Sequence, residues 1–224
     1  NLIFSSINGQ QRAYNLYKIL LTDKIKPFFY NFNESLIGKP TESFKFDKKN
    51  YSASSLNYLT GLLFLKNHIG KLDNKIFLEI GGGFGTVGEI LYKLKIKNFK
   101  YINFDLPPLN IISEYYLRKS CNQKIGNHFS YLNNNKIYIK KLKKLNSFPN
   151  FDIEKLSGKI DIFLNFISFQ EMEHTIVSNY IDKIFKLNPK FILLRNLREG
   201  KNTSKNKNKY KHKFSYFVKK PIKK

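Results

Sequence analysis

The stretch Lys75-Ile-Phe-Leu-Glu-Ile-Gly-Gly-Gly-Phe-Gly85 decides the fold of this 224-residue chain. Residues 75–80 form a short apolar run with one acid near its end, which is typical of a buried parallel strand. Glycines follow at once, and residues 86–94 then have the pattern of a helix. Strand, glycine turn and helix in this order predict the first half of a βαβ unit, in which the backbone turns sharply and leaves room for a ligand.

The spacing of these glycines separates two classes of ligand. Residues 83–88 fit the dinucleotide pattern Gly-x-Gly-x-x-Gly, but its first glycine should follow the strand directly, and the strand ends at Ile80. The pattern Glu-x-Gly-x-Gly-x-Gly that begins at Glu79 starts where the strand stops. It resembles the first motif of S-adenosylmethionine (SAM) dependent methyltransferases. We therefore favour SAM over a nicotinamide cofactor, with a glycine-rich turn that binds nothing as the third interpretation.

The remainder of the chain predicts an α/β domain with a mostly parallel sheet and helices on both faces. Further strands are expected at 99–104, 136–140, 160–167 and 191–194, with an edge strand at 214–218, and helices at 86–94, from about 107 to 119, and 173–187. Upstream, helices are expected at 11–22 and from Ser52 or Ser54 to about 68, joined by an irregular connection over 26–50. We predict that an N-terminal helical segment, 1–70, covers the ligand cleft of a core domain, 71–224.

The formal net charge of +24 suggests anionic partners. The kinds of residue that supply this charge weaken that conclusion. Only four of the 40 basic residues are arginines, and the abundant Lys, Asn, Ile and Phe indicate an AT-rich genome. Ten of the lysines fall in residues 201–224, where there is no acid, so the other 200 residues carry 30 bases and 16 acids. Nucleotides, phosphorylated sugars, RNA or an acidic membrane surface are all compatible with this charge, as is a solvated lysine-rich surface.

Cellular location follows from what the sequence contains. No stretch approaches the roughly 20 apolar residues that a membrane-spanning helix needs. Nothing at the start resembles a secretory signal. The single cysteine, Cys121, excludes an internal disulfide and fits a reducing compartment. We expect a cytoplasmic protein without a transmembrane segment.

An acid follows the second predicted strand. Because ligands of parallel sheets bind beyond the carboxyl ends of the strands, Asp105 is placed to accept hydrogen bonds from both hydroxyls of a ribose. The alternative is that Asp105 only caps the following helix. The joint occurrence of a glycine turn and this acid favours ribose binding.

A polar cluster, Asn165-Phe-Ile-Ser-Phe-Gln-Glu-Met-Glu-His174, follows the fourth predicted strand. Glu171 and His174 are three residues apart, so they share a face if the helix has begun there. Glu171 is our first candidate for a catalytic base and His174 the second. In the alternative, the acids complement the positive helix N-terminus and His174 is an ordinary exposed histidine.

Two of the four arginines, Arg195 and Arg198, follow the fifth predicted strand. They could form a bidentate anchor for a phosphate or carboxylate, or be ordinary arginines at a strand exit. No His/Cys group has the spacing of a zinc site, so no metal ligands are assigned.

Together these motifs resemble the sugar O-methyltransferases of bacterial surface-polysaccharide gene clusters. The likeness covers about residues 37–195 and rests on the segments Glu79-Ile-Gly-Gly-Gly-Phe-Gly85, Asp105-Leu-Pro107 and Asn165-Phe-Ile-Ser-Phe-Gln-Glu-Met172, of which the Ser-Phe-Gln-Glu-Met part is the most specific. The upstream segments Ile37-Gly-Lys-Pro40 and Ser52-Ala-Ser-Ser-Leu-Asn-Tyr58 also fit that family. Small-molecule O-methyltransferases often carry a His-Asp pair after the fourth strand; here Phe169-Gln170 stands in its place, so the base has to be sought elsewhere.

The resemblance implies a Rossmann-like class I methyltransferase that moves the methyl group of SAM to a hydroxyl of a sugar or sugar nucleotide, in capsule or lipopolysaccharide biosynthesis. It implies cofactor contacts from Glu79, Gly81, Gly82, Gly83, Phe84, Gly85, Asp105, Leu106 and Asn165. It also implies acceptor contacts from Ser168, Gln170, Arg195 and Arg198. The expected partner is a small anionic acceptor and not a nucleic acid, and a homo-oligomer is compatible with such a domain.

Two other functions stay open. The charge suggests an RNA methyltransferase, but no Asn-Pro-Pro-Tyr-type base-methylation motif follows the fourth strand and no recognised RNA-binding module is present. The third interpretation is a non-enzymatic anion-binding protein whose lysine-rich tail contacts membrane or nucleic acid.

Overall fold

The computed structural model describes residues 2–23, 27–196 and 217–218, with side chains described for 9–23 and 27–196. Its centre is a six-stranded sheet in the order β10-β9-β8-β3-β4-β6. The five strands from β9 to β6 are parallel, and β10 pairs antiparallel with β9 at one edge. In the order of the chain, the parallel strands run outward from β3 through β4 to β6 and then return to β8 and β9, which is the arrangement of a Rossmann-like sheet.

The strands of the central sheet and the helices around it have the following bounds. The strands are β3 (Ile76–Ile80), β4 (Lys100–Asp105), β6 (Leu145–Pro149), β8 (Ile162–Phe166), β9 (Phe191–Arg195) and β10 (Phe217–Val218). The helices are α1 (Leu2–Leu21), α2 (Ala53–Ile69), α3 (Thr86–Lys93), α4 (Leu109–Cys121) and α5 (His174–Lys186). Short 3-10 turns are η1 (His128–Tyr131), η2 (Ile139–Lys141), η3 (Asn150–Lys155) and η4 (Ser168–Glu171).

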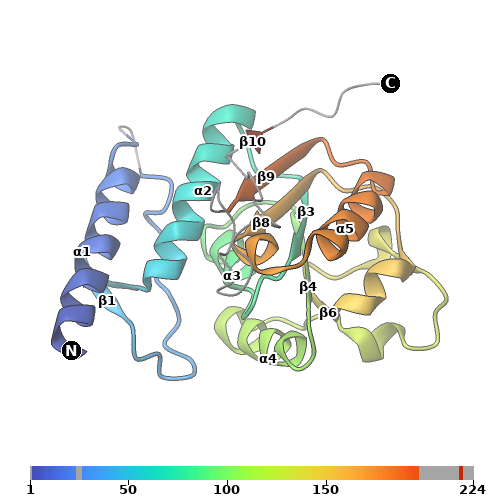
Figure 1. Cartoon of the computed structure of the whole chain (residues 1–224), viewed down its shortest axis with the longest axis horizontal. Coiled ribbons are helices and arrows are strands. Elements are labelled where there is room, and N and C mark those ends of the chain that lie inside the picture. Colours follow the sequence, from blue (N-terminus) through green and yellow to red (C-terminus); the bar gives the residue numbers. More distant parts are fainter. Residues whose placement is uncertain (1, 24–26, 197–216, 219–224) are drawn as a thin grey trace.

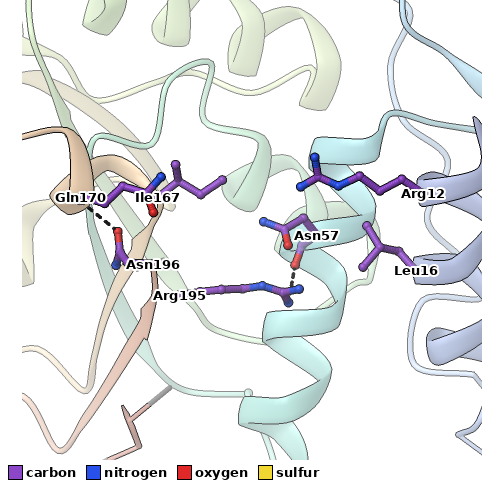
Figure 2. A pocket seen from close by; sticks show the side chains of 7 residues that line it. All are labelled: Arg12, Leu16, Asn57, Ile167, Gln170, Arg195 and Asn196. Carbon is purple, nitrogen blue, oxygen red and sulfur yellow. Dashed lines mark hydrogen bonds between the residues drawn. The ribbon is translucent and has the colours of Figure 1, made fainter. Parts of the chain in front are cut away.

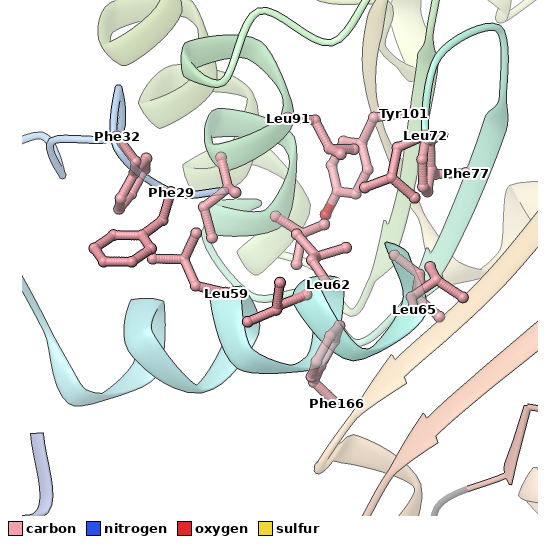
Figure 3. Close-up of a cluster of buried hydrophobic side chains, with 14 of the residues drawn as sticks. Phe29, Phe32, Leu59, Leu62, Leu65, Leu72, Phe77, Leu91, Tyr101 and Phe166 are labelled. Atoms are coloured by element: carbon pink, nitrogen blue, oxygen red, sulfur yellow. The ribbon is translucent and has the colours of Figure 1, made fainter. Parts of the chain in front are cut away.

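Alternation along the strands places one hydrophobic core on each face of the sheet. Phe77 of β3 belongs to a cluster with side chains of α2, α3 and α4, whereas its neighbour Leu78 belongs to a second cluster with side chains of α5. Figure 3 shows the first cluster, in which leucines of α2 pack toward the sheet. The structure therefore confirms the predicted class, a mostly parallel α/β sheet covered on both faces (Figure 1).

The N-terminal segment is more ordered than the sequence suggested. Helix α1 packs beside α2, away from the sheet (Figure 1), and begins well before the expected residue 11. The expected irregular connection contains a hairpin of β1 (Phe44–Phe46) and β2 (Lys49–Tyr51). Its two turn residues, Asp47 and Lys48, both have positive φ, at 46° and 63°. Such turns usually carry Asn-Gly or Asp-Gly, so Asp-Lys gave no signal.

The expected third strand was placed wrongly. Residues 136–140 supply only the two-residue strand β5 (Ile137–Tyr138), which pairs with β7 (Leu156–Ser157) outside the central sheet. The third strand of the sheet is β6, in which all five residues are buried. Its polar side chains are satisfied internally, since the Asn146 amide donates to the carbonyl of Tyr101 and the Ser147 hydroxyl to that of Asn110.

Candidate active site

The glycine turn joins β3 to α3 at the switch point of the sheet, between β3 and β8. Three of its residues have positive φ: Gly81 at 70°, Gly83 at 55° and Gly85 at 80°. L-residues with a side chain avoid this region, so glycine is required at each position. The N–H of Gly81 donates to the carbonyl of Phe104 at 2.8 Å, which ties the turn to β4.

Crowding around the turn differs from one glycine to the next. A Cβ on Gly81 would lie 2.3 Å from the Ser168 hydroxyl oxygen. A Cβ on Gly82 would lie 2.6 Å from Asn103 Oδ1 and 2.8 Å from Glu79 Oε2. A Cβ on Gly83 would meet nothing within 4 Å. The first two glycines therefore pack against the protein, and the third faces open space.

Glu79 lies beneath the turn and not in the open space above it. Only 1% of the residue is exposed, and its carboxylate accepts a hydrogen bond from the Tyr101 hydroxyl. The pKa of Glu79 is raised to about 8, chiefly by burial. The hydrogen bond from Tyr101 lowers this pKa, and the nearby Asp105 carboxylate raises it further. In this position Glu79 supports the turn from below.

Asp105 ends β4 and shapes the turn from the other side. Its Oδ2 accepts from the N–H of Gly83 and its Oδ1 from the N–H of Leu106, both at 2.7 Å. Burial raises the pKa of Asp105, and the two backbone hydrogen bonds oppose that rise. Because α4 begins only at Leu109, with Pro108 as its N-cap residue, Asp105 is not the cap of this helix.

Two large apolar side chains directly follow Gly83 and Asp105 in the chain. Phe84 is 53% exposed and Leu106 is 58% exposed, although both adjoin buried parts of the fold. The region around Gly83 thus combines a carboxylate, free backbone space and exposed apolar surface. A ligand with a diol and a flat apolar ring suits this combination.

Asn165 fastens the segment after β8 to the glycine turn. Its Nδ2 donates to the carbonyl of Ile80 at 2.9 Å and to the Ser168 hydroxyl at 2.7 Å. Its Oδ1 accepts from the N–H of Phe169 and from the side chain of Asn196, at 3.1 and 3.0 Å. These four bonds use the full capacity of the amide. Asn165 and Ser168, expected to contact cofactor and acceptor, therefore hold the neighbouring segments together.

A pocket opens beside this segment, between the N-terminal helices and the ends of β8 and β9 (Figure 2). It has a cavity volume of about 290 Å³. The lining residues come from α1, α2, the segment after β8 and the end of β9: Arg12, Leu16, Asn57, Ile167, Gln170, Arg195 and Asn196. The Arg195 guanidinium donates to the main-chain carbonyl of Asn57 at 2.9 Å and to the Thr60 hydroxyl, which joins the end of β9 to α2.

Ile167, in the wall of this pocket, has a strained backbone. Its φ is 72°, which is a genuine outlier for a β-branched residue. The conformation is held by the hydrogen bond from its N–H to the carbonyl of Arg195, at 2.9 Å, and by the Asn165 network. Strained residues that the surroundings enforce are concentrated at functional sites.

The condition for Glu171 and His174 to share a helical face is not met, because the helix has not begun at Glu171. Glu171 ends the 3-10 turn η4, Met172 is extended, and α5 begins only at His174. Both Glu171 and His174 are exposed. The physical reason is that the buried Phe169 and the Asn165 bonds hold residues 168–171 in a tighter turn before α5 starts. Arg198 lies outside the described residues.

Sequence reasoning gave no role in the site to several side chains that the structure places there. Arg12 and Asn57, from α1 and α2, line the pocket although both precede the glycine turn by more than 20 residues. Tyr58 packs edge-on against Phe166, with 4.9 Å between ring centroids. Burial raises the pKa of Tyr58, as do the carboxylates of Glu79, Glu34 and Asp105. The one signal available for Arg12 was the scarcity of arginine in a lysine-rich chain.

In the parts of the chain that the structure describes, no group of three or more His, Cys, Asp or Glu residues could hold a metal ion. Over those same parts, none of the helices is both long and apolar enough to span a membrane.

Comparison with known proteins reveals similarity of fold only. No protein-family model matches the chain, and no curated protein matches it significantly. Similar solved structures include a SAM dependent methyltransferase from Aquifex aeolicus, with 13% identity, a TM-score of 0.43, and coverage of 65% of this chain and 68% of that one. Magnesium protoporphyrin IX methyltransferase from Synechocystis PCC 6803, solved with bound SAM, has 12% identity, a TM-score of 0.43, and coverage of 63% and 59%.

A third similar structure is coclaurine N-methyltransferase bound to N-methylheliamine and SAH, with 16% identity and a TM-score of 0.44. The alignment covers 88% of this chain but only 52% of that one. Identities this low concern the fold alone, so any functional assignment has to rest on the residues of the site.

Proposed function

We propose that this chain is a SAM-dependent O-methyltransferase that acts on a hydroxyl of a sugar or sugar nucleotide. The observation that carries the proposal is the open space over Gly83, bordered by Asp105 and by the exposed Phe84 and Leu106, at the switch point of a parallel sheet.

The cofactor would lie over the turn formed by Gly81, Gly82, Gly83, Phe84 and Gly85. Asp105 would accept hydrogen bonds from the ribose hydroxyls, and Leu106 and Phe84 would contact the adenine. Glu79 and Asn165 would act indirectly by holding the turn and the segment after β8. When bound, SAM supplies a methyl group on a positively charged sulfur, which is already activated for transfer.

The protein would mainly align the acceptor oxygen with that methyl group. As the acceptor oxygen took up the methyl group, a base of the chain would accept the hydroxyl proton. The pocket beside Ile167 would hold the acceptor, with Ser168 and Gln170 near the reacting hydroxyl. We propose further that residues 1–70 cover this cleft, since Arg12, Leu16 and Asn57 form its outer wall.

Calorimetry with SAM, S-adenosylhomocysteine and NAD tests the cofactor. We expect the first two to bind, and NAD to bind far more weakly. Binding of NAD alone would overturn the proposal. Methyl transfer from radiolabelled SAM to a panel of nucleotide-linked and phosphorylated sugars then tests the reaction.

Glu171 and His174 are the proposed bases, because both are exposed and follow β8 at the carboxyl edge of the sheet. Glu171→Gln cannot accept a proton, so we expect turnover to fall by roughly two to four orders of magnitude while SAM affinity stays nearly constant. Normal turnover in Glu171→Gln with an inactive His174→Gln would move the role to the histidine. Normal turnover in both would exclude both residues.

A further inference from the structure

Arginine is distributed unevenly in this protein. Of the 40 basic residues only four are arginines, yet two of these, Arg12 and Arg195, line the same pocket. An AT-rich genome explains the abundance of lysine but does not explain why two of the few arginines, far apart in the sequence, line one pocket. Arginine presents a planar set of donors that matches the oxygens of a phosphate or carboxylate.

The rest of the lining has the same electrostatic character. Three amide side chains, Asn57, Gln170 and Asn196, accompany the two guanidinium groups, and the lining includes no carboxylate among the described residues. Leu16 and Ile167 supply apolar surface. Positive charge with amide donors and no acid favours an anion over a cation or a neutral apolar molecule.

The two arginines have different tasks. Arg195 is anchored, because its guanidinium bonds the Asn57 carbonyl and the Thr60 hydroxyl. Arg12 is exposed on α1, and Figure 2 shows its side chain extending toward Asn57 across the pocket. Arg195 thus gives a fixed positive wall, and Arg12 a cation that can adjust to a ligand.

The pocket shares a wall with the glycine turn. Ile167 and Gln170 line it, and between them Ser168 donates to the carbonyl of Ile80 at 2.9 Å. A ligand anchored at the arginines would therefore lie next to the segment that packs against the start of the turn. A volume of about 290 Å³ lies just below the range of roughly 300–1,000 Å³ for small-molecule sites, which favours one sugar unit over a larger acceptor.

We propose that this pocket binds the oxyanion of a monosaccharide that carries a phosphate or carboxylate, with Arg12 as the anchoring cation and Arg195 as a positioning residue. The proposal rests on the proposed function in one respect only, namely that the bound sugar is the methyl acceptor. Anion binding itself needs no methyl donor, so it is tested separately.

Calorimetry on the full chain without SAM, at constant ionic strength, would use glucose 1-phosphate, glucuronate, inorganic phosphate and glucose as probes. We expect the first two to bind and neutral glucose to bind far more weakly. Phosphate binding with no gain from the sugar would show an adventitious ion only, and would overturn the proposal. Equal affinity for glucose and its phosphate would also overturn it.

Two variants locate the site. Arg12→Gln should weaken binding of glucose 1-phosphate by at least about tenfold, as expected for a lost hydrogen bond to a charged group. Asn57→Asp keeps the volume and adds a negative charge to the lining; the main-chain carbonyl that Arg195 bonds is unchanged, so the fold should persist. We expect it to abolish binding of the anion.

Arg118→Gln is the matched control, since Arg118 is an exposed arginine on α4, outside the lining residues. Its affinity should equal that of the wild type. Unchanged affinity in Arg12→Gln, or an equal loss in Arg118→Gln, would contradict the site. Loss of anion binding with SAM binding intact concerns only this pocket, whereas failure to bind SAM with anion binding intact concerns only the proposed reaction.

Discussion

The fold alters the protonation of Glu79 within a range of pH that stability measurements can reach. Its pKa rises from 4.5 to about 8 because burial disfavours the carboxylate. Between these values the folded protein keeps a proton that the unfolded chain releases. Its contribution to stability is therefore fully present below pH 4.5 and is lost as the pH rises through about 8.

We predict that Glu79→Gln loses this dependence on pH. The difference in unfolding free energy between variant and wild type, measured with urea from pH 6 to 9, should shift in favour of the variant as the pH rises. Tyr101→Phe removes the hydrogen bond that lowers the pKa of Glu79. In this variant the pH at which Glu79 loses its proton, and with it the change in stability, should therefore be higher than in the wild type. A difference that stays constant with pH would show that the buried carboxyl does not titrate in this range.

Substitution of Asp105 tests whether the cofactor binds at the end of β4. If it holds the ribose diol, Asp105→Ala should weaken SAM binding by about 1.5–3 kcal/mol, as for lost hydrogen bonds to a charged group. Calorimetry would measure this loss, and urea unfolding would measure the cost of releasing the Gly83 and Leu106 N–H groups. Asp73→Ala, at the opposite edge of the sheet, is the control. Unchanged SAM affinity in Asp105→Ala would refute ribose binding.

At the scale of the element, two glycines of the turn have different roles: Gly81 packs against the protein, and Gly83 faces the space proposed for the cofactor. Gly81→Ala meets both a positive φ and the Ser168 hydroxyl, whereas Gly83→Ala meets only a positive φ, a cost of roughly 1–2 kcal/mol. We predict that Gly81→Ala is the more destabilised of the two in urea. Gly83→Ala should instead lose SAM affinity by more than about tenfold, because its methyl group occupies the space that the proposed cofactor needs. Equal SAM affinity in Gly83→Ala and wild type would place the cofactor elsewhere.

Sequence patterns predicted the elements that depend on local chemistry. The Ser52 cap of α2 accepts from the N–H of Ser55, as a capping residue should, and the turn after Ile80 falls where the register placed it. The sequence patterns did not predict β6. Its buried Asn146 and Ser147 form hydrogen bonds with partners on β4 and α4, which no local pattern reveals. The pocket was missed for the same reason, since its walls combine α1 with residues far along the chain.

At the scale of the whole molecule, the net charge of +24 leaves the RNA alternative to be tested. Six lysines precede the short strand β10 in the sequence: Lys201, Lys205, Lys207, Lys209, Lys211 and Lys213. Replacing all six with Gln lowers the formal charge from +24 to +18 and leaves β10 in place. Electrostatic binding to a polyanion weakens with each lost positive charge, and its dependence on salt becomes shallower.

We predict that this six-Gln variant keeps the wild-type affinity for SAM and the wild-type rate of methyl transfer to a phosphorylated sugar. The reason is that the proposed cofactor and acceptor sites are both formed by residues before Leu197, within the core and the N-terminal helices. The measurement is turnover with radiolabelled SAM, run in parallel on the sugar panel and on total RNA at two salt concentrations. Label transferred to RNA by the wild type, and reduced in the variant, would favour the RNA methyltransferase. Transfer to sugar at equal rates in both proteins would assign the lysine-rich segment no part in the reaction.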